Sequence, residues 1–173
     1  NMHIIIDETI RLSSLVTELL DFSKLQAGTL KMEPSVFSLT QAVTAILTRY
    51  NKLKEQEGYQ ILFEPAEECT VYADEGRIGQ VIYNLINNAL TYTGPDKTVT
   101  VTQTVEGDQV RIAVHDRGQG IPQEELPLIW NRYYRSKENH KRAIQGSGLG
   151  LSIVRSILEA HHAPYGVESQ AGT

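Results

Sequence analysis

Polar side chains spaced three and four residues apart, near the middle of the chain, could hold a metal ion. Gln80, Asn84, Asn88 and Thr91 fall on one face of a predicted helix whose other positions are largely apolar. Asparagine is a poor helix former because its amide competes for backbone hydrogen bonds, so two at i and i+4 need an explanation. A neutral carboxamide oxygen can bind Mg²⁺ without repelling a triphosphate as a carboxylate would. A solvated helix face is the alternative interpretation.

Two glycine-rich segments could let a ligand approach the backbone. In the first, Asp116, Gly118 and Gly120 follow a predicted strand, where glycine permits positive φ and the carboxylate can accept a hydrogen bond from an exocyclic amine. The second, residues 146–150, opens a helix whose free N–H groups suit phosphates. It is neither a Walker loop, since no Gly-Lys-Ser/Thr follows, nor a dinucleotide fingerprint, since no strand precedes it. A plain turn and a glycine-rich hinge remain alternatives.

The elements that must position these segments alternate between helices and strands. Helices are predicted over residues 2–26, 39–57, 75–91, 124–130 and 149–161, and strands over 30–37, 59–63, 70–73, 98–105, 109–115 and 166–169. Ser38 and Asp74 are predicted helix caps, and the segment 106–108 predicts a hairpin turn. The irregular stretch over 117–147 is typical of a functional lid or of a disordered segment. This order predicts an α+β fold with helices on one face of a mixed sheet.

The first predicted helix carries a narrow apolar stripe. Ile5, Leu12 and Leu19 recur every seven residues, with Leu15 and Phe22 between them. An isolated helix cannot bury such a face, so the pattern favours one helix of an antiparallel hairpin or bundle; packing on its own domain is the alternative. With Gly28 as the boundary, we expect two units, residues 1–28 and 29–173.

The composition excludes several classes of protein. The chain has 173 residues, of which 40% are hydrophobic and 21% charged, as in a globular protein with a sizeable core. The formal net charge of −5 disfavours nucleic acid as a partner. No apolar run is long enough to span a membrane. A single cysteine, Cys69, excludes an intrachain disulfide and a cysteine metal cluster.

Four motifs in a fixed order resemble those of sensor histidine kinases. Residues 84–89 (NLINNA), 116–121 (DRGQGI), 129–135 (IWNRYYR) and 146–154 (GSGLGLSIV) are similar to the asparagine, first glycine, aromatic and second glycine boxes of that family. Residues 8–25 also resemble the second helix of its dimerisation and histidine-phosphotransfer domain. The resemblance implies a two-layer α/β sandwich, the Bergerat ATP-binding fold shared with gyrase, chaperone and mismatch-repair ATPases, preceded by one long amphipathic helix.

The resemblance also implies roles for individual residues. Asn84 and Asn88 would hold Mg²⁺, and Asp116 would contact the adenine amino group. The implied ATP-binding set is Asn84, Asn88, Tyr92, Asp116, Gly118, Gly120, Ile121, Tyr134, Arg135, Lys141, Arg142, Gly146, Ser147, Gly148, Leu149 and Gly150. Thr91 departs from the family, which often has a basic residue there. We expect the lid cations Lys137, His140, Lys141 and Arg142 to compensate; a solvated loop face is the alternative.

The phosphate acceptor is a second departure. In the family it is a His followed by an acidic residue, and none of the five histidines fits. We therefore expect the acceptor helix to precede this segment and a final strand to follow it, so that the segment binds ATP without phosphorylating itself.

The expected function is that of the ATP-binding catalytic domain of a sensor histidine kinase. The γ-phosphoryl group of ATP would pass to the upstream His and then to an Asp of a response-regulator receiver domain. The parent protein is expected to be a homodimer through the N-terminal helix and anchored in the cell membrane, with this portion in the cytoplasm. The alternatives are a protein-serine kinase or an ATPase of the same fold, or a non-catalytic docking module. Asn84 stands where the ATPases carry the Glu that activates water, which disfavours hydrolysis.

Overall fold

The computed structural model describes residues 19–20, 23–24, 31–132, 134 and 149–170. Most of the helix predicted over 2–26, and the part of the 117–147 lid after residue 134, lie outside the described residues, so both stay predictions. Among the described residues, no helix has the length and apolarity that a membrane crossing requires.

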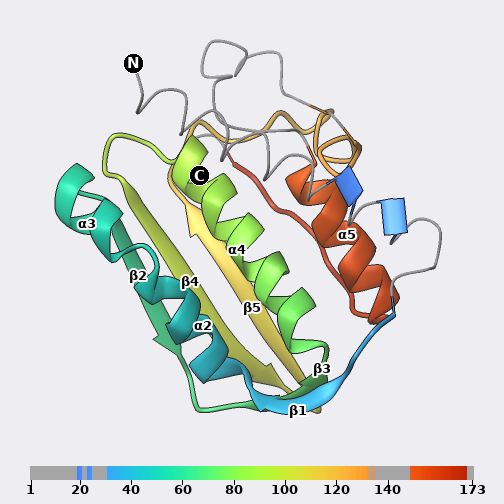
Figure 1. Cartoon of the computed structure of the whole chain (residues 1–173). Coiled ribbons are helices and arrows are strands. Elements are labelled where there is room, and N and C mark those ends of the chain that lie inside the picture. Colours follow the sequence, from blue (N-terminus) through green and yellow to red (C-terminus); the bar gives the residue numbers. More distant parts are fainter. Residues whose placement is uncertain (1–18, 21–22, 25–30, 133, 135–148, 171–173) are drawn as a thin grey trace, which may run out of the picture.

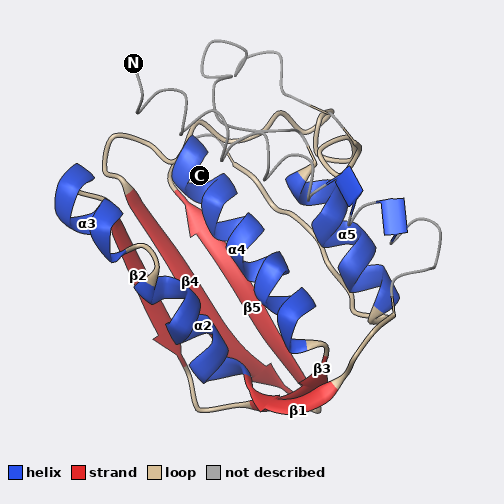
Figure 2. Cartoon of the chain, in the orientation of Figure 1, coloured by secondary structure: helices blue, strands red, loops and turns tan. Residues whose placement is uncertain are grey.

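The described core is a layer of helices on a layer of strands (Figures 1 and 2). A three-stranded mixed sheet pairs β2 (Gln60–Pro65) parallel to β4 (Thr98–Glu106), which is antiparallel to β5 (Gln109–Asp116). A separate antiparallel ribbon joins β1 (Ser35–Ser38) to β3 (Thr70–Ala73). The helices are α2 (Leu39–Thr48), α3 (Asn51–Glu57), α4 (Glu75–Tyr92) and α5 (Gly150–Ala160). The α+β prediction with a mixed sheet and helices on one face is confirmed.

Local signals set the starts of the two longer sheet-covering helices. The Ser38 side chain accepts a hydrogen bond from the Gln41 N–H at 3.2 Å, and Asp74 accepts one from the Arg77 N–H at 3.1 Å. Each such cap contributes about 0.5–2 kcal/mol. The β4–β5 turn likewise has Gly107 at φ +64, as a two-residue hairpin loop of this kind requires.

Three sequence predictions of secondary structure are wrong. The single helix over 39–57 is split into α2 and α3, because Tyr50 turns inward and is buried while α3 buries none of its residues. Residues 124–130 form successive turns, with hydrogen bonds such as Leu128 N–H to Glu125 O, rather than an α-helix. Residues 166–169 form no strand; this segment instead contacts the loop after β5.

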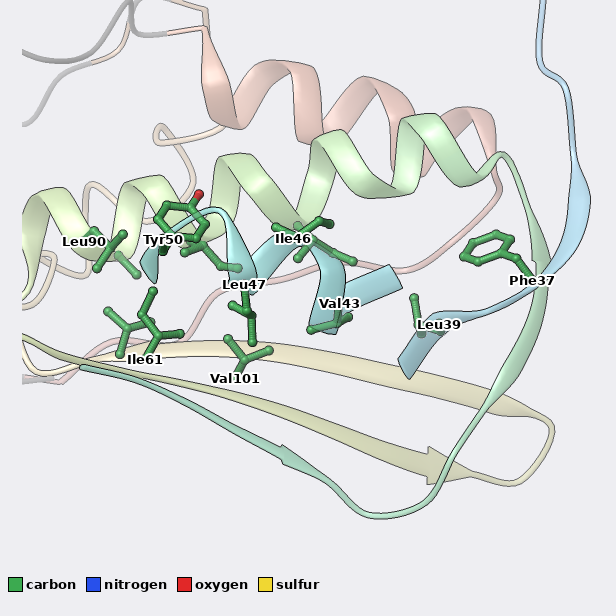
Figure 3. Packing of buried hydrophobic residues seen from close by; sticks show 13 residues of the cluster. Phe37, Leu39, Val43, Ile46, Leu47, Tyr50, Ile61, Leu90 and Val101 are labelled. Carbon is green, nitrogen blue, oxygen red and sulfur yellow. The ribbon is translucent and has the colours of Figure 1, made fainter. Parts of the chain in front are cut away.

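Helix α4 belongs to two hydrophobic clusters. Toward the sheet, Ile82, Ile86, Ala89 and Leu90 pack with residues of α2, β2 and β4, among them Val43, Leu47, Ile61 and Val101 (Figure 3). On its other side, Val81 packs with Leu149, Ile153, Val154 and Ile157 at and along α5. The position of α5 therefore depends on α4 rather than on the sheet.

Asp74 is expected to make stability depend on pH. Burial raises the pKa of this carboxyl. Hydrogen bonds from the Glu33 and Arg77 N–H groups and the nearby positive charge of Arg77 lower the pKa, and together they outweigh burial. The net pKa of Asp74 therefore lies below its usual value. A depressed folded-state pKa gives stability that is present above the unfolded-state pKa and lost as pH falls through the folded-state pKa.

We therefore expect Asp74→Asn to lower the free energy of unfolding by roughly 1 kcal/mol at neutral pH, and the difference from the wild type to shrink below about pH 4. Urea denaturation of both proteins from about pH 7 down to about pH 2.5 measures it, because the loss occurs below about pH 4. A difference that stays constant over this range would contradict the assignment.

Candidate functional site

The predicted motif segments meet at one end of the two layers, where α4 ends, β5 ends and α5 begins (Figure 1). A Cβ atom added at Gly118 would lie 2.2 Å from the Tyr92 carbonyl oxygen, and one at Gly94 would lie 2.4 Å from the Arg117 carbonyl oxygen. The segment after β5 therefore crosses in direct backbone contact with the end of α4. Glycine at 118 and 94 is required by this close approach.

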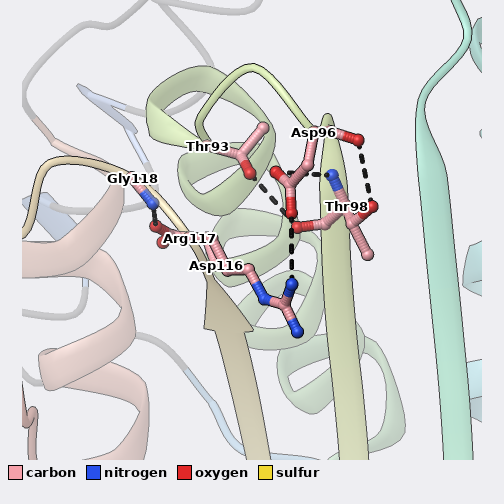
Figure 4. A network of polar contacts seen from close by, with 6 residues as sticks. All are labelled: Thr93, Asp96, Thr98, Asp116, Arg117 and Gly118. Atoms are coloured by element: carbon pink, nitrogen blue, oxygen red, sulfur yellow. Dashed lines mark hydrogen bonds and ion pairs between the residues drawn. The ribbon is translucent and has the colours of Figure 1, made fainter. Parts of the chain in front are cut away.

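Asp116 stands at the end of β5 with its carboxylate held in place. Its Oδ1 atom accepts a hydrogen bond from the Gly118 N–H at 2.8 Å (Figure 4). Among the described residues this is the one hydrogen bond of the Asp116 carboxylate, so Oδ2 is available to a ligand donor. The side chain of the next residue, Arg117, reaches instead to Asp96, with Nη1 and Oδ2 3.9 Å apart.

The α4–β4 turn beside Asp116 is fixed by short-range hydrogen bonds (Figure 4). Thr93 Oγ1 donates to the Thr98 carbonyl at 3.1 Å, and Thr98 Oγ1 donates to the Asp96 carbonyl at 3.0 Å. Because Thr93 is buried, these bonds hold the end of α4 and the start of β4 together. The surface on which the Asp116–Gly118 segment lies is therefore rigid.

Contacts from the segment after α5 brace the second glycine of the motif. Gly120 has φ +82, and a Cβ atom there would lie 2.5 Å from the Gln170 carbonyl oxygen. The Ile121 N–H donates to Ser169 Oγ at 2.7 Å, and Gln123 Nε2 donates to the Ser169 carbonyl at 3.1 Å. Sequence reasoning missed Ser169, because nothing local to residue 169 indicates a partner 48 positions away.

The three asparagines of α4 have different surroundings. Asn84 Nδ2 donates to the Gly150 carbonyl at 3.4 Å and so faces the start of α5. Asn87 Oδ1 accepts a hydrogen bond from the Tyr50 hydroxyl at 2.8 Å. Burial, and then the neighbouring Tyr83, raise the pKa of Tyr50 above its usual range, so this hydroxyl stays protonated. The Asn87 side chain is thus engaged by Tyr50, whereas Asn84 and the half-buried Asn88 lie on the side of α4 toward α5.

The donor set fits Mg²⁺ held jointly with phosphates. Asn84 and Asn88 offer neutral amide oxygens one helical turn apart. Among the described residues, no group of His, Cys, Asp or Glu side chains could hold a metal ion by itself. Mg²⁺ commonly takes one or two protein oxygens and completes its shell with phosphates and water. Thr91 adds no charge here because its hydroxyl is neutral, and its Oγ1 donates to the Asn87 carbonyl at 2.8 Å.

The first turn of α5 leaves room for an anion. Leu149 caps α5 without any side-chain hydrogen bond to the helix N–H groups, and a Cβ atom added at Gly150 would meet nothing within 4 Å. N–H groups of a first helical turn have no partner inside the helix. The phosphate site that the glycine spacing predicts at this end of α5 stays a prediction, because residues 146–148 lie outside the described residues.

Two further predicted site residues, Tyr92 and Tyr134, are described. Burial together with a hydrogen bond to Glu125 raises the pKa of Tyr134 to about 12. The role of Tyr134 beside a nucleotide stays a prediction. Tyr92 is partly exposed at the end of α4. The remaining lid positions lie outside the described residues: Arg135, Lys141, Arg142, Gly146, Ser147 and Gly148.

Two surface hollows lie elsewhere and do not locate the site. One of about 420 Å³ lies beside α2, lined by Thr40, Thr44 and Glu68 among others. The other, of about 360 Å³, lies beside the α4–β4 turn, lined by Tyr59, Thr91 and Lys97 among others. Neither is lined by described residues of the Asp116–Gly120 segment or of α5.

Comparison with known proteins agrees with this geometry. Residues 73–173 match the family model of the histidine kinase-, DNA gyrase B-, and HSP90-like ATPases. The chain belongs to this family. Within it, the chain is 32% identical to the nucleotide-free catalytic domain of histidine kinase ThkA, covering 75% of this chain and 82% of that one with a TM-score of 0.66. It is therefore the ATP-binding catalytic domain of a sensor histidine kinase.

Longer relatives carry further information about this histidine-kinase domain. It is 32% identical over 166 residues to the autoinducer 2 sensor kinase/phosphatase LuxQ of Vibrio cholerae, covering 93% of the chain and 19% of LuxQ. The crystal structure of full-length ShkA in complex with AMPPNP matches 94% of the chain and 34% of ShkA at 25% identity, with a TM-score of 0.81. ThkA in complex with the response regulator TrrA matches 92% of the chain and 43% of ThkA at 28% identity, with a TM-score of 0.71. The chain spans about a fifth to a third of the curated relatives it matches.

A Gly118→Ala substitution tests the close approach at the end of α4. The added Cβ would collide with the backbone oxygen of Tyr92 and lie 2.9 Å from Asp116 Oδ1, so the Asp116 segment must move. We expect a loss of unfolding free energy of about 1–3 kcal/mol, together with weaker nucleotide binding.

Gly166→Ala is the matched control, since its Cβ would meet nothing within 4 Å and its φ is not in the left-handed region. Thermal denaturation and nucleotide titration compare the two variants. Equal stability of both variants would contradict the close contact between residue 118 and the Tyr92 backbone.

Proposed function

We propose that the domain binds Mg²⁺–ATP between α4, the Asp116–Ile121 segment and α5. It would deliver the γ-phosphoryl group to a His on an upstream helix, from which an Asp of a response regulator receives it. Three features near the same end of the domain carry this proposal. One oxygen of the Asp116 carboxylate has no hydrogen bond to the described residues. Two amide side chains lie on α4, and the first turn of α5 has no side-chain cap. Each part suits a different portion of ATP.

Asp116 and its neighbours would bind the base. The carboxylate, oriented by the Gly118 N–H, would accept a hydrogen bond from the adenine amino group. Gly118 and Gly120 keep this segment against the end of α4 and against Gln170, where any side chain would collide with backbone. Tyr92 and Ile121 would supply apolar surface beside the ring.

The phosphates would lie between α4 and α5. The N–H groups of the first turn of α5 from Gly150 onward, with Gly146, Ser147 and Gly148 before it, would donate hydrogen bonds to phosphate oxygens. Asn84 and Asn88 would hold Mg²⁺, which neutralises phosphate charge when bound. Arg135, Lys141 and Arg142, with Tyr134, would complete the site from the lid and supply the positive charge that Thr91 does not.

The chain's own residues favour phosphoryl transfer over hydrolysis. The position four residues before Asn88 is Asn84, an amide that cannot act as a general base and is already bonded to Gly150. Water bound at the site would therefore not be activated. The domain would position ATP, and the acceptor side chain would come from outside these residues.

The relatives support a place in a two-component pathway. ShkA was crystallised with the ATP analogue AMPPNP, and ThkA with the response regulator TrrA. In our proposal residues 1–28 are the second helix of the dimerisation and phosphotransfer domain, and residues 29–173 are the ATP-binding domain. The parent would be a membrane-anchored homodimer with this part in the cytoplasm.

Replacing Asp116 tests recognition of adenine. Asp116→Asn places an amide that can donate where the adenine amine also donates, so affinity for an ATP analogue should fall roughly tenfold or more. Asp96→Asn removes a nearby exposed carboxylate and should leave affinity unchanged. Calorimetric titration of the 173-residue chain in Mg²⁺ measures both. No binding, or binding indifferent to Asp116, would exclude the proposed ATP site.

Replacing Asn88 tests the Mg²⁺ site. We expect Asn88→Ala to remove most of the difference in ATP-analogue affinity between buffer with Mg²⁺ and buffer with EDTA. The neighbouring Asn87→Ala should keep that difference and instead lose about 1 kcal/mol of stability, because it removes the acceptor of the Tyr50 hydroxyl. If both variants respond to Mg²⁺ like the wild type, Asn88 is not a ligand.

A further inference from the structure

Helix α5 is tied to α4 at both of its ends. At its start, the Gly150 carbonyl accepts the hydrogen bond from Asn84; at its end, His161 Nε2 accepts a hydrogen bond from the Asp74 backbone N–H at 3.0 Å. Asp74 and Asn84 lie about three turns apart on α4, as do Gly150 and His161 on α5. The two antiparallel helices are therefore held in one axial register by contacts at opposite ends.

Both ring nitrogens of His161 are used. Nδ1 lies 2.8 Å from the Ile157 carbonyl oxygen, which can only accept, and Nε2 faces the Asp74 N–H, which can only donate. The partners thus require a neutral imidazole with its proton on Nδ1. A proton on Nε2 would place two donors against each other.

The contact extends to the chain before β1. The Asp74 carboxylate, besides capping α4, accepts a hydrogen bond from the Glu33 N–H at 3.0 Å. Asp74 is buried, whereas His161 is half-buried and Glu33 is exposed. Asp74 thereby joins three segments: the segment before β1, the start of α4 and the end of α5.

We propose that His161 is a positioning residue for the nucleotide: its neutral ring holds the end of α5 on the start of α4, and thereby keeps Gly150 in place beneath the phosphates. Protonation of the ring breaks the bond to Asp74, lets α5 shift along α4 and weakens nucleotide binding. This inference rests on the proposed ATP site and adds a residue at the far end of α5, remote from that site.

Charged groups around His161 come from both helices. On α4, the Asp74 carboxylate lies beside the ring, and Arg77 lies close enough to Asp74 to lower the pKa of that carboxyl. On α5 itself, Glu159 is engaged by Arg155 at 3.0 Å and by the Tyr165 hydroxyl at 2.9 Å, and His162 is exposed. From the segment before β1, Glu33 contributes its N–H to Asp74.

The test compares three variants in the 173-residue chain by titration with Mg²⁺–ADP between about pH 8 and pH 5.5, which spans the ordinary His range. His161→Gln keeps an acceptor for the Asp74 N–H but cannot titrate. His161→Leu removes the acceptor at similar volume. His162→Asn is the matched control, since His162 has φ +53 and asparagine tolerates that conformation.

We expect the wild type and His162→Asn to lose affinity more steeply on acidification than His161→Gln, which retains near-wild-type affinity at pH 8. The ligand's own titration cancels in this comparison. His161→Leu should bind roughly three- to tenfold more weakly at pH 8 with the shallow profile of the Gln variant.

Identical pH profiles of the wild type and His161→Gln overturn the proposal, even if His161→Leu does not fold. The outcome is separate from that of the ATP site: if the wild type binds and Asp116→Asn does not, the ATP site stands whatever the His161 variants show. If the wild type binds no nucleotide, the proposed function fails and this inference fails with it.

Discussion

The structure depends on one helix that must be buried on two sides. Helix α4 presents Ile82, Ile86 and Leu90 to the sheet and Val81 to α5. Asn84 and Asn88 are half-buried on the side of α4 toward the start of α5. A charged side chain at such a half-buried position would need a counter-ion, whereas an amide needs only a hydrogen bond. The burial of α4 therefore accounts for neutral side chains at these two positions.

Backbone contact at the end of α4 imposes the second constraint. The segment after β5 lies so near Tyr92 and Gln170 that residues 118 and 120 have no space for a Cβ atom. Glycine there costs conformational entropy on folding, and the hydrogen bonds of Thr93, Asp116 and Ser169 offset part of that cost. The result is a carboxylate whose direction is set before any ligand arrives. Such preorganisation reduces the cost of binding.

Sequence reasoning succeeded where the signal is local. Ser38 and Asp74 were recognisable as caps, the Gly107 turn as a hairpin, and the four motifs as those of histidine kinases, because each depends on a few adjacent residues. It failed where distant partners decide the outcome. The break between α2 and α3 follows from Tyr50 turning toward Asn87, and the irregular path near residue 169 follows from Ser169 bonding to Ile121. Helical spacing separated Asn88 from Asn87, but nothing in the sequence indicated that Asn87 accepts a hydrogen bond from the Tyr50 hydroxyl.

The tie between α4 and α5 has a consequence for how the domain folds and opens. Asp74 and His161 are 87 positions apart and Asn84 and Gly150 are 66, whereas the β4–β5 hairpin closes over two residues. Contacts between distant positions form late and at a larger entropic cost. The hairpin and the α4 core can exist before α5 docks, and α5 can detach without unfolding them. We therefore expect the backbone amides of α5 to be less protected than those of β4, and the proposed nucleotide-binding face to be the part of the domain that opens first.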